Sequence, residues 1–234
     1  EQLKNPCRPS NLKCAPPIEF MHLLNMTKNI TEFQERVNKT RVSSNLDPPE
    51  GSIDAIVQAV ACKSEIGWRT HSHKLLIFAS NDRFHLAGDG RLGGVVIPND
   101  GRCHLDTEGR YTKELEQDYP SVSQMVDIVS KNEVNIIFAV TRNQVSLFKK
   151  LSSRIPNSIV ELLADSNDNE NLNIKQIIEK KYKEMLSEVE IVHNKVQGVD
   201  IEIKATSEHC QGKGTNKCKS LSNLGFNGTP ITFD

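Results

Sequence analysis

Long hydrophobic runs, aromatic residues and excess charge are all scarce in this sequence of 234 residues. No apolar run approaches the roughly 20 residues that a membrane-spanning helix needs. Aromatic residues make up 5% of the chain, and 29 basic residues nearly balance 30 acidic ones, which does not indicate a nucleic-acid groove. The length suits one large domain, or one domain with an appended piece. No signal peptide opens the chain at Glu1, and we interpret it as a piece of a longer protein.

Motifs of common enzymes are also missing. The chain contains no GxSxG, HExxH or P-loop, and its seven histidines lack metal-ligand spacing. His104 beside Asp106, or His85 near Asp89, could serve as an acid and a base, but a catalytic site also needs a nucleophile or a metal. We therefore interpret both histidines as surface polar residues. The protein is predicted not to be an enzyme, with a secreted α/β enzyme kept as an alternative.

The six cysteines form two local pairs and one distant pair, without the CxxC spacing of zinc sites. This arrangement favours the disulfides Cys7–Cys14, Cys62–Cys103 and Cys210–Cys218. Four asparagines begin N-x-T glycosylation sequons: Asn25, Asn29, Asn38 and Asn227. Three of these sequons fall within 14 residues. Together with the disulfides they predict an extracellular protein.

An acidic loop with two prolines precedes an apolar helical run. Its Asn45, Asp47, Pro49 and Glu50 offer amide, carboxylate and carbonyl oxygens, which hard cations prefer as ligands. The Pro48–Pro49 pair lowers the entropy cost of holding them in one geometry. The alternative is an acidic turn at a helix N-terminus, where carboxylates suit the helix dipole.

Two further polar stretches stand out. The residues Ser80-Asn81-Asp82 follow an apolar run at 74–79, and ligands of open α/β sheets bind at the carboxyl ends of strands. The segment Gly88–Gly94 has four glycines in seven residues but matches no nucleotide-binding loop. From residue type alone, Arg91 in this segment is interpreted as a solvated surface charge.

Strand-like and helix-like patterns alternate along most of the chain. The apolar spacing predicts helices at 31–38, opened by the capping box Thr31-x-x-Gln34, and at 52–63, 121–131, 144–154 and 173–189. Strands are predicted at 18–26, 74–79, 134–141 and 158–164. This alternation predicts an α/β fold of the Rossmann-like, doubly wound class, with a mostly parallel sheet covered on both faces. Alternating apolar residues at 199–203 predict a half-exposed strand, so we assign residues 1–195 to one domain and 196–234 to a partial β-rich segment.

Several collinear motifs resemble the I-like domain of integrin β subunits. They are NLDPPEG from Asn45, IGWR from Ile66, FHLAGDGRLGG from Phe84, PNDGRCHL from Pro98, DYPS from Asp118 and IFAVT from Ile137. The resemblance implies a von Willebrand A-type fold followed by the start of a hybrid domain. It also implies a cell-adhesion receptor fragment, a headpiece that pairs with an integrin α subunit and binds an extracellular protein ligand. The fragment would be the extracellular part of a single-pass cell-surface protein, without direct membrane contact.

The resemblance also assigns roles to residues. In the family, Asn45, Asp47, Pro49 and Glu50 match ligands of a synergistic cation site, and Glu50 also matches a ligand of the magnesium-binding adhesion site. Arg91 matches an arginine that inserts into the α subunit. The helix at 173–189 resembles the one whose displacement carries activation. The ligand-specificity loop would be Cys7, Arg8, Pro9, Ser10, Asn11, Leu12, Lys13 and Cys14, and Cys62–Cys103 matches a family disulfide.

Three departures from the family pattern bear on metal binding. The DxSxS motif would lie before Glu1, Asn81 stands where the family usually has an aspartate, and the loop at 165–171 is longer. Because an amide oxygen carries no formal charge, we predict weak or absent binding of magnesium, calcium or manganese and an impaired adhesion site. A pactolus-like or divergent invertebrate member would show such departures. The alternative is a metal-independent integrin-like surface glycoprotein that acts without an α subunit. The family's first strand, which carries the DxSxS motif, would also lie before Glu1. Without it, unpaired strand edges predict self-association.

Overall fold

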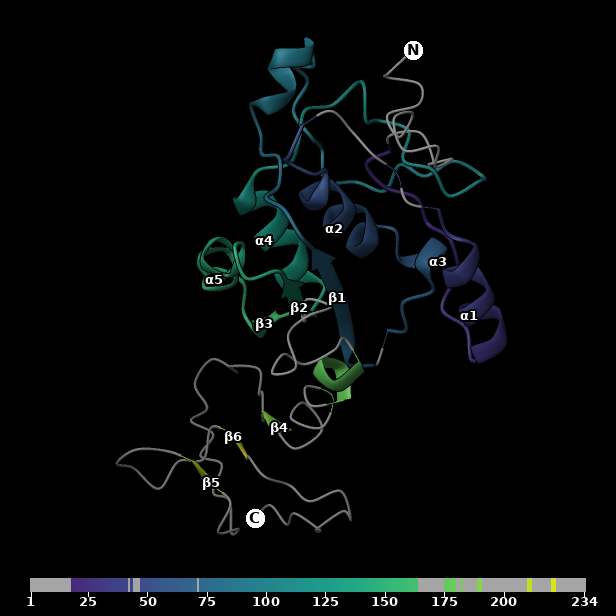
Figure 1. The fold of residues 1–234 in the computed structure, drawn as a ribbon, viewed down its shortest axis with the longest axis vertical. Coiled ribbons are helices and arrows are strands. Elements are labelled where there is room, and N and C mark those ends of the chain that lie inside the picture. The colour runs from purple at the N-terminus through teal and green to yellow at the C-terminus, as the bar shows by residue number, and fades with distance from the viewer. Residues whose placement is uncertain are drawn as a thin grey trace, which may run out of the picture. The chain divides into compact units, whose positions relative to one another are not determined.

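The chain divides into two compact units, Glu1–Asn171 and Leu172–Asp234 (Figure 1). A computed structural model describes residues 18–41, 43, 47–70, 72–163, 175–179 and 182, and the backbone of 189–190, 210–211 and 220–221. The predicted domain boundary after residue 195 lies outside these residues and stays a prediction. No helix in the described ranges is both long enough and apolar enough to cross a membrane.

A parallel three-stranded sheet lies at the centre of the first unit. Its strands are β1 (Lys74–Ser80), β2 (Val134–Val140) and β3 (Ser158–Leu162), in the order β1-β2-β3. The register places Phe78 of β1 beside Phe138 of β2, and Phe138 beside Val160 of β3. The predicted strands are therefore confirmed here, and the parallel sheet flanked by helices confirms the Rossmann-like fold class.

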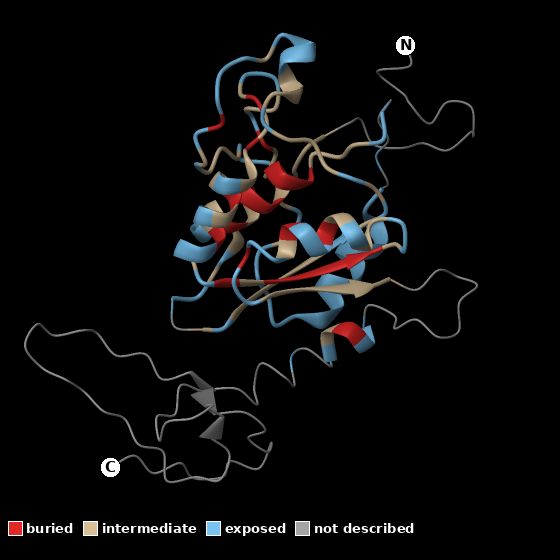
Figure 2. Cartoon of the chain, turned by 90° about the vertical axis from the view of Figure 1, so that its left-hand side faces the viewer, coloured by how far each residue is buried: buried red, intermediate tan, exposed pale blue. Residues whose placement is uncertain are grey.

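Three helices share one core with the sheet: α2 (Ser52–Ala61), α4 (Val122–Lys131) and α5 (Val145–Ser152). Alternate residues of a strand point to the same face, and alternate residues of β2 enter this core. Figure 2 shows the buried residues on the middle strand and on the inner sides of helices. The fully buried core includes Ile53, Ile56, Val57, Met125, Val129, Ile136, Phe138, Val140 and Phe148. The predicted helices at 52–63, 121–131 and 144–154 are confirmed with ends shifted by one to two residues.

The predicted disulfide between Cys62 and Cys103 is confirmed, and it ties the end of α2 to the loop at 102–104. Gln58 strengthens this link, because its Nε2 donates to the Arg102 carbonyl at 2.8 Å and its Oε1 accepts from the His104 amide at 2.9 Å. Closing a loop of this sequence separation, 41 residues, stabilises the fold by about 4 kcal/mol in the chain-entropy account. The pairs Cys7–Cys14 and Cys210–Cys218 involve residues outside the described ranges.

Two predictions for the segment before α1 (Ile30–Lys39) are wrong. The range 18–26 contains one isolated bridge, from Met21 to Arg110, instead of a strand. The N-cap of α1 is Asn29, not Thr31, and its side chain accepts from the Glu32 amide at 3.2 Å. Asparagine is the stronger N-cap residue, which favours the earlier start.

Shorter elements complete the description. Helix α3 (Lys63–Ile66) follows α2, and the 3-10 helix η2 (Asp89–Gly93) lies in the glycine-rich segment. In the second unit, β4 (Val189–Glu190), β6 (Ser220–Leu221) and β5 (Cys210–Gln211) pair antiparallel in the order β4-β6-β5. Within the predicted helix at 173–189, residues 175–179 and 182 are helical, and the predicted strand at 199–203 lies outside the described residues.

Candidate cation loop and partner-facing turn

The acidic loop runs beside the chain that leaves β1. The Glu50 amide donates to the Arg83 carbonyl at 3.0 Å, and the His85 amide donates to the Glu50 carbonyl at 2.9 Å. These two bonds form a parallel bridge between Glu50 and Phe84. The acidic loop is thereby held against the segment that follows β1 and Asn81. Of the predicted loop ligands, Asn45 lies outside the described residues.

His85 connects the acidic loop to the glycine-rich segment. Its Nε2 lies 3.1 Å from Asp47 Oδ2, and its Nδ1 lies 3.1 Å from Asp89 Oδ2. The ring stacks on Tyr119 with centroids 4.5 Å apart. The interpretation of His85 as a surface residue is therefore wrong, because its side chain is only 15% exposed. His104 pairs with Asp100 at 2.9 Å rather than with Asp106.

Asp89 is held as a carboxylate by its neighbours. Its Oδ2 accepts from the Leu86 amide at 3.0 Å as well as facing His85. These hydrogen bonds, first the one from Leu86, lower the pKa of Asp89 despite the opposing effect of burial. The charge on Asp89 therefore persists to lower pH than that of an ordinary aspartate.

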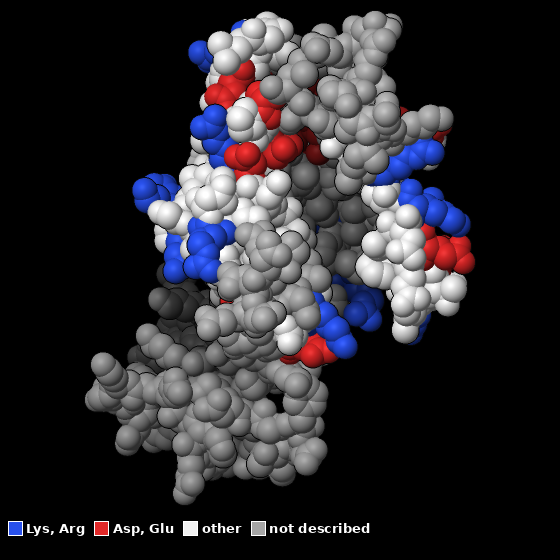
Figure 3. Space-filling view, viewed as in Figure 1, with Lys and Arg blue, Asp and Glu red and all other residues white. Residues whose placement is uncertain are grey.

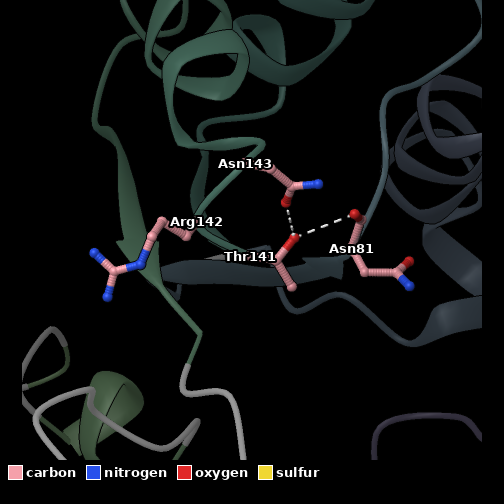
Figure 4. Close-up of a pocket in the computed structure, with 4 residues that line it drawn as sticks. All are labelled: Asn81, Thr141, Arg142 and Asn143. Atoms are coloured by element: carbon pink, nitrogen blue, oxygen red, sulfur yellow. Dashed lines mark hydrogen bonds between the residues drawn. The ribbon is translucent and has the colours of Figure 1, made fainter. Parts of the chain in front are cut away.

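Asn81 lines an open pocket at the carboxyl ends of β1 and β2. Its other lining residues are Thr141, Arg142 and Asn143, and its volume is about 560 Å³. The Thr141 hydroxyl lies 3.1 Å from the Asn81 carbonyl and 2.6 Å from Asn143 Oδ1. Figure 4 shows the amide of Asn81 directed away from Thr141, and the Arg142 guanidinium directed away from the other three residues. The polar residues that follow β1 thus lie at the carboxyl end of that strand, as the sequence predicted.

The turn that carries Arg91 is held by a buried carboxylate. Asp118 is 7% exposed, and its two oxygens accept from the amides of Gly88 at 2.7 Å and Gly90 at 2.9 Å. With the turn fixed in this way, Arg91 is exposed and Leu92 is 96% exposed. Sequence reasoning missed both Asp118 and Leu92, although Asp118 opens the DYPS motif.

A second pair of carboxyls, the buried Asp54 and the partly buried Glu19, lies close to the acidic loop. Burial, followed by repulsion from Asp54 and Glu114, raises the pKa of Glu19 to about 8. Burial also raises the pKa of Asp54 to about 7. Asp54 Oδ1 accepts from Asn99 at 3.0 Å, whereas its Oδ2 has no hydrogen-bond partner among the described residues. No pattern in the sequence indicated this pair, because Glu19 lies in the segment that was predicted to be a strand.

The donor chemistry of the acidic loop suits a hard divalent cation. Asp47, Glu50 and the carbonyl of Pro49 offer oxygen, the ligand atom of magnesium, calcium and manganese. Figure 3 shows acidic side chains gathered in the upper part of the view, in the direction in which the arrowhead of β1 points in Figure 1. By contrast, the one group of three metal-capable side chains within 4.8 Å among the described residues is Cys62, Glu65 and Cys103. The disulfide removes both thiolates from that group.

Other predicted site residues fall into two groups. The sequon residues Asn25, Asn29 and Asn38 are exposed, which leaves them accessible to glycan attachment. The ligand-specificity loop from Cys7 to Cys14 and the sequon at Asn227 lie outside the described residues. Their roles stay predictions.

Comparison with known proteins shows the family to which the chain belongs. A family model described as the integrin beta chain VWA domain matches residues 1–189. The chain belongs to the integrin β family. It is 41% identical to integrin beta pat-3 of Caenorhabditis elegans over 218 residues, which are 91% of this chain and 26% of that protein.

Two further relatives are similar over comparable lengths. The chain is 40% identical to integrin beta-PS of Drosophila melanogaster over 225 residues, 94% of this chain and 25% of that protein. It is 44% identical to integrin beta-7 of Mus musculus over 214 residues, 90% of this chain and 25% of that protein. The chain thus spans about a quarter of the length of these relatives.

Proposed function

We propose that this chain acts in cell adhesion as part of an integrin β-subunit headpiece, which pairs with an α subunit and binds an extracellular protein ligand. The whole protein would be a single-pass cell-surface glycoprotein. Membership of the integrin β family supports the proposal that the protein is a cell-adhesion receptor. The outward turn at Arg91 and Leu92, braced by Asp118, supports the pairing.

Arg91 is the proposed anchor for the α subunit. Because the turn is braced, the backbone that presents the guanidinium loses little conformational freedom on binding, and a neighbouring exposed leucine adds apolar contact. An arginine stacked on aromatic rings in a desolvated interface contributes roughly 2 kcal/mol. Arg91 therefore belongs in the centre of the interface rather than at its rim.

Replacing Arg91 by alanine tests the pairing. We expect Arg91→Ala to weaken the affinity for a soluble α-subunit head by about thirtyfold, the equivalent of about 2 kcal/mol, as measured by surface plasmon resonance. Arg102→Ala, which removes another exposed arginine, is the matched control and should leave the affinity unchanged. An unaltered chain that binds no α subunit would favour the metal-independent glycoprotein that acts alone.

We also propose that the acidic loop provides part of a divalent-cation site. Asp47, Glu50 and the Pro49 carbonyl would be its ligands from this loop, with Asn45 as a fourth, and Asn81 would face the neighbouring adhesion site. The magnesium of that adhesion site, to which Glu50 would also contribute, would take a carboxylate from the protein ligand. Because Asp47 and Glu50 are the only charged ligands that the loop would supply, we expect a dissociation constant of about 10⁻⁴–10⁻³ M.

Calorimetric titration of manganese, magnesium and calcium into the oxidised chain tests the cation site. Saturable binding is expected in the unaltered chain and is expected to disappear in Glu50→Ala, because that change removes one of the two loop carboxylates. Glu116→Ala removes an exposed carboxylate elsewhere and serves as the control. Binding that survives in Glu50→Ala would place the cation somewhere other than the acidic loop.

A further inference from the structure

Positive charge is concentrated around helix α5. Residues 134–160 contain no acidic side chain but four basic ones, Arg142, Lys149, Lys150 and Arg154, in a chain whose net charge is -1. Lys149 and Lys150 are exposed on the last turn of α5, and the exposed Arg154 follows directly after it. These three residues define the basic surface of α5. Figure 3 shows Lys and Arg side chains gathered on the left of the view, where α5 lies in Figure 1.

The end of α5 does not need these cations as caps. An α-helix leaves its last four carbonyls without helical partners, and basic side chains often fill that role. In α5 the carbonyls of residues 149–152 all accept other hydrogen bonds, at 2.8–3.0 Å. Their donors are the amide and hydroxyl of Ser153 and the amides of Arg154 and Ile155. No ion pair joins the basic surface to the described part of the chain. Its cations are therefore available to a partner.

The basic surface of α5 offers charge and hydrogen-bond donors but no apolar contact. The large side chains of Phe148 and Leu151 are buried beneath it, and no large apolar side chain between residues 116 and 163 is exposed. A protein partner would need an apolar centre at the interface, and a single-stranded nucleic acid would need an exposed aromatic ring for its bases. A polyanion without apolar groups needs neither, so this surface fits such a partner best.

The basic surface lies at the end of the sheet opposite the acidic loop. The Ser158 hydroxyl, at the start of β3, donates to the Ser152 carbonyl at 3.0 Å, which places the end of α5 beside the amino ends of the parallel strands. The acidic loop bonds instead to Arg83 and His85, in the chain that leaves the carboxyl end of β1. A partner bound to α5 would therefore leave the acidic loop accessible.

We propose that the basic surface of α5 binds a sulfated polysaccharide of the cell surface or extracellular matrix. Sulfate groups are permanent anions that repeat along such a chain, and Lys and Arg side chains donate charge-assisted hydrogen bonds to them. The three cations lie within five residues, a span of about 8 Å on a helix, so one short stretch of the polyanion can contact all of them. The choice of an extracellular polyanion rests on the proposed cell-surface location.

Binding of the oxidised chain to immobilised heparin tests this inference. The unaltered chain should be retained at about 0.15 M salt. The triple variant Lys149→Gln, Lys150→Gln and Arg154→Gln should bind at least about tenfold more weakly, because it loses three exposed ion contacts. The slope of log affinity against log salt should also become shallower by about two to three, since each contact with a polyanion releases nearly one counterion.

A second triple variant controls for net charge. Arg36→Gln, Lys63→Gln and Arg102→Gln together remove the same charge from exposed positions outside α5 and should bind heparin as the unaltered chain does. Equal weakening in the two triple variants, or an unaltered chain that is not retained, overturns the inference. Undiminished binding to desulfated heparin overturns it too, and tighter binding to polyglutamate would indicate an acidic protein partner instead. Arg91→Ala and Glu50→Ala should keep full heparin binding, so the result does not depend on α-subunit pairing or on the cation site.

Discussion

At the scale of single residues, Asp54 and Glu19 make stability depend on pH. Their ordinary pKa values are 3.8 and 4.5, and in the folded chain burial raises them to about 7 and about 8. Between about pH 4 and pH 8 the folded chain therefore binds more protons than the unfolded chain. The free energy of unfolding should fall as the pH rises through this window, since the buried carboxyls must then ionise.

Replacing Asp54 by asparagine removes one of the two titrations. We expect Asp54→Asn to flatten the dependence of the unfolding free energy on pH by up to about 1.4 kcal/mol per pH unit between about pH 4 and pH 7. The variant should be more stable than the unaltered chain at pH 8 and lose that advantage by pH 5. Urea denaturation at a series of pH values measures this.

An exposed aspartate provides the comparison for Asp54. Asp127 lies on α4 with its side chain 70% exposed beside Lys131, so Asp127→Asn should leave the pH dependence nearly unchanged. Stability curves for Asp54→Asn and the unaltered chain that run parallel across the window would contradict the raised pKa of Asp54.

At the scale of elements, the segment at 18–26 is attached by main-chain hydrogen bonds to the turn at 109–111. The His22 amide donates to the Gly109 carbonyl at 2.7 Å, and the Tyr111 amide donates to the Phe20 carbonyl at 3.0 Å. Gly109 has a φ of 81°, in the left-handed region, and a Cβ there would collide with the His22 carbonyl oxygen. Only glycine satisfies both the conformation and the close approach.

Gly109→Ala should therefore loosen the attachment of this segment. The left-handed conformation alone costs an alanine about 1–2 kcal/mol, and the collision adds to it, so we expect a destabilisation of about 2 kcal/mol or more in urea denaturation. Gly93→Ala is the control, since a Cβ there meets nothing within 4 Å and the change should have little effect. Equal stability of the two variants would show that the contact between the segment and the turn does not contribute to the free energy of unfolding.

The helices and the parallel strands were predictable because the sequence encodes their burial locally. The apolar run of β2 and the helical spacing of α2 each reflect one continuous stretch facing the core. The segment at 18–26 has a strand-like composition, but a strand also needs a partner along its length, which composition does not specify. The acidic loop was recognisable from its oxygen donors. The contacts of His85 were not, because they join residues far apart in the sequence.

At the scale of the molecule, apolar surface remains uncovered. Helix α1 has no buried residue, and its Ile30, Phe33 and Val37 recur on one face at 72%, 56% and 54% exposure. Leu23 and Met26 are also exposed, at 41% and 51%. In addition, β1 pairs with a strand on one side only among the described residues, although its composition is that of a buried strand. Contiguous exposed apolar surface and a free strand edge both favour association with another chain.

We therefore expect the isolated chain to self-associate as its concentration rises. Placing a charge on the apolar face of α1 should oppose this, so Phe33→Lys is expected to weaken association by about tenfold or more, because burial of one phenylalanine contributes roughly 2 kcal/mol. Ser130→Lys adds the same charge at an exposed position of α4 and should associate as the unaltered chain does. Sedimentation velocity over a range of concentrations distinguishes the variants. A chain that stays monomeric throughout would show that this surface does not drive association, whereas equal weakening in both variants would attribute the effect to net charge.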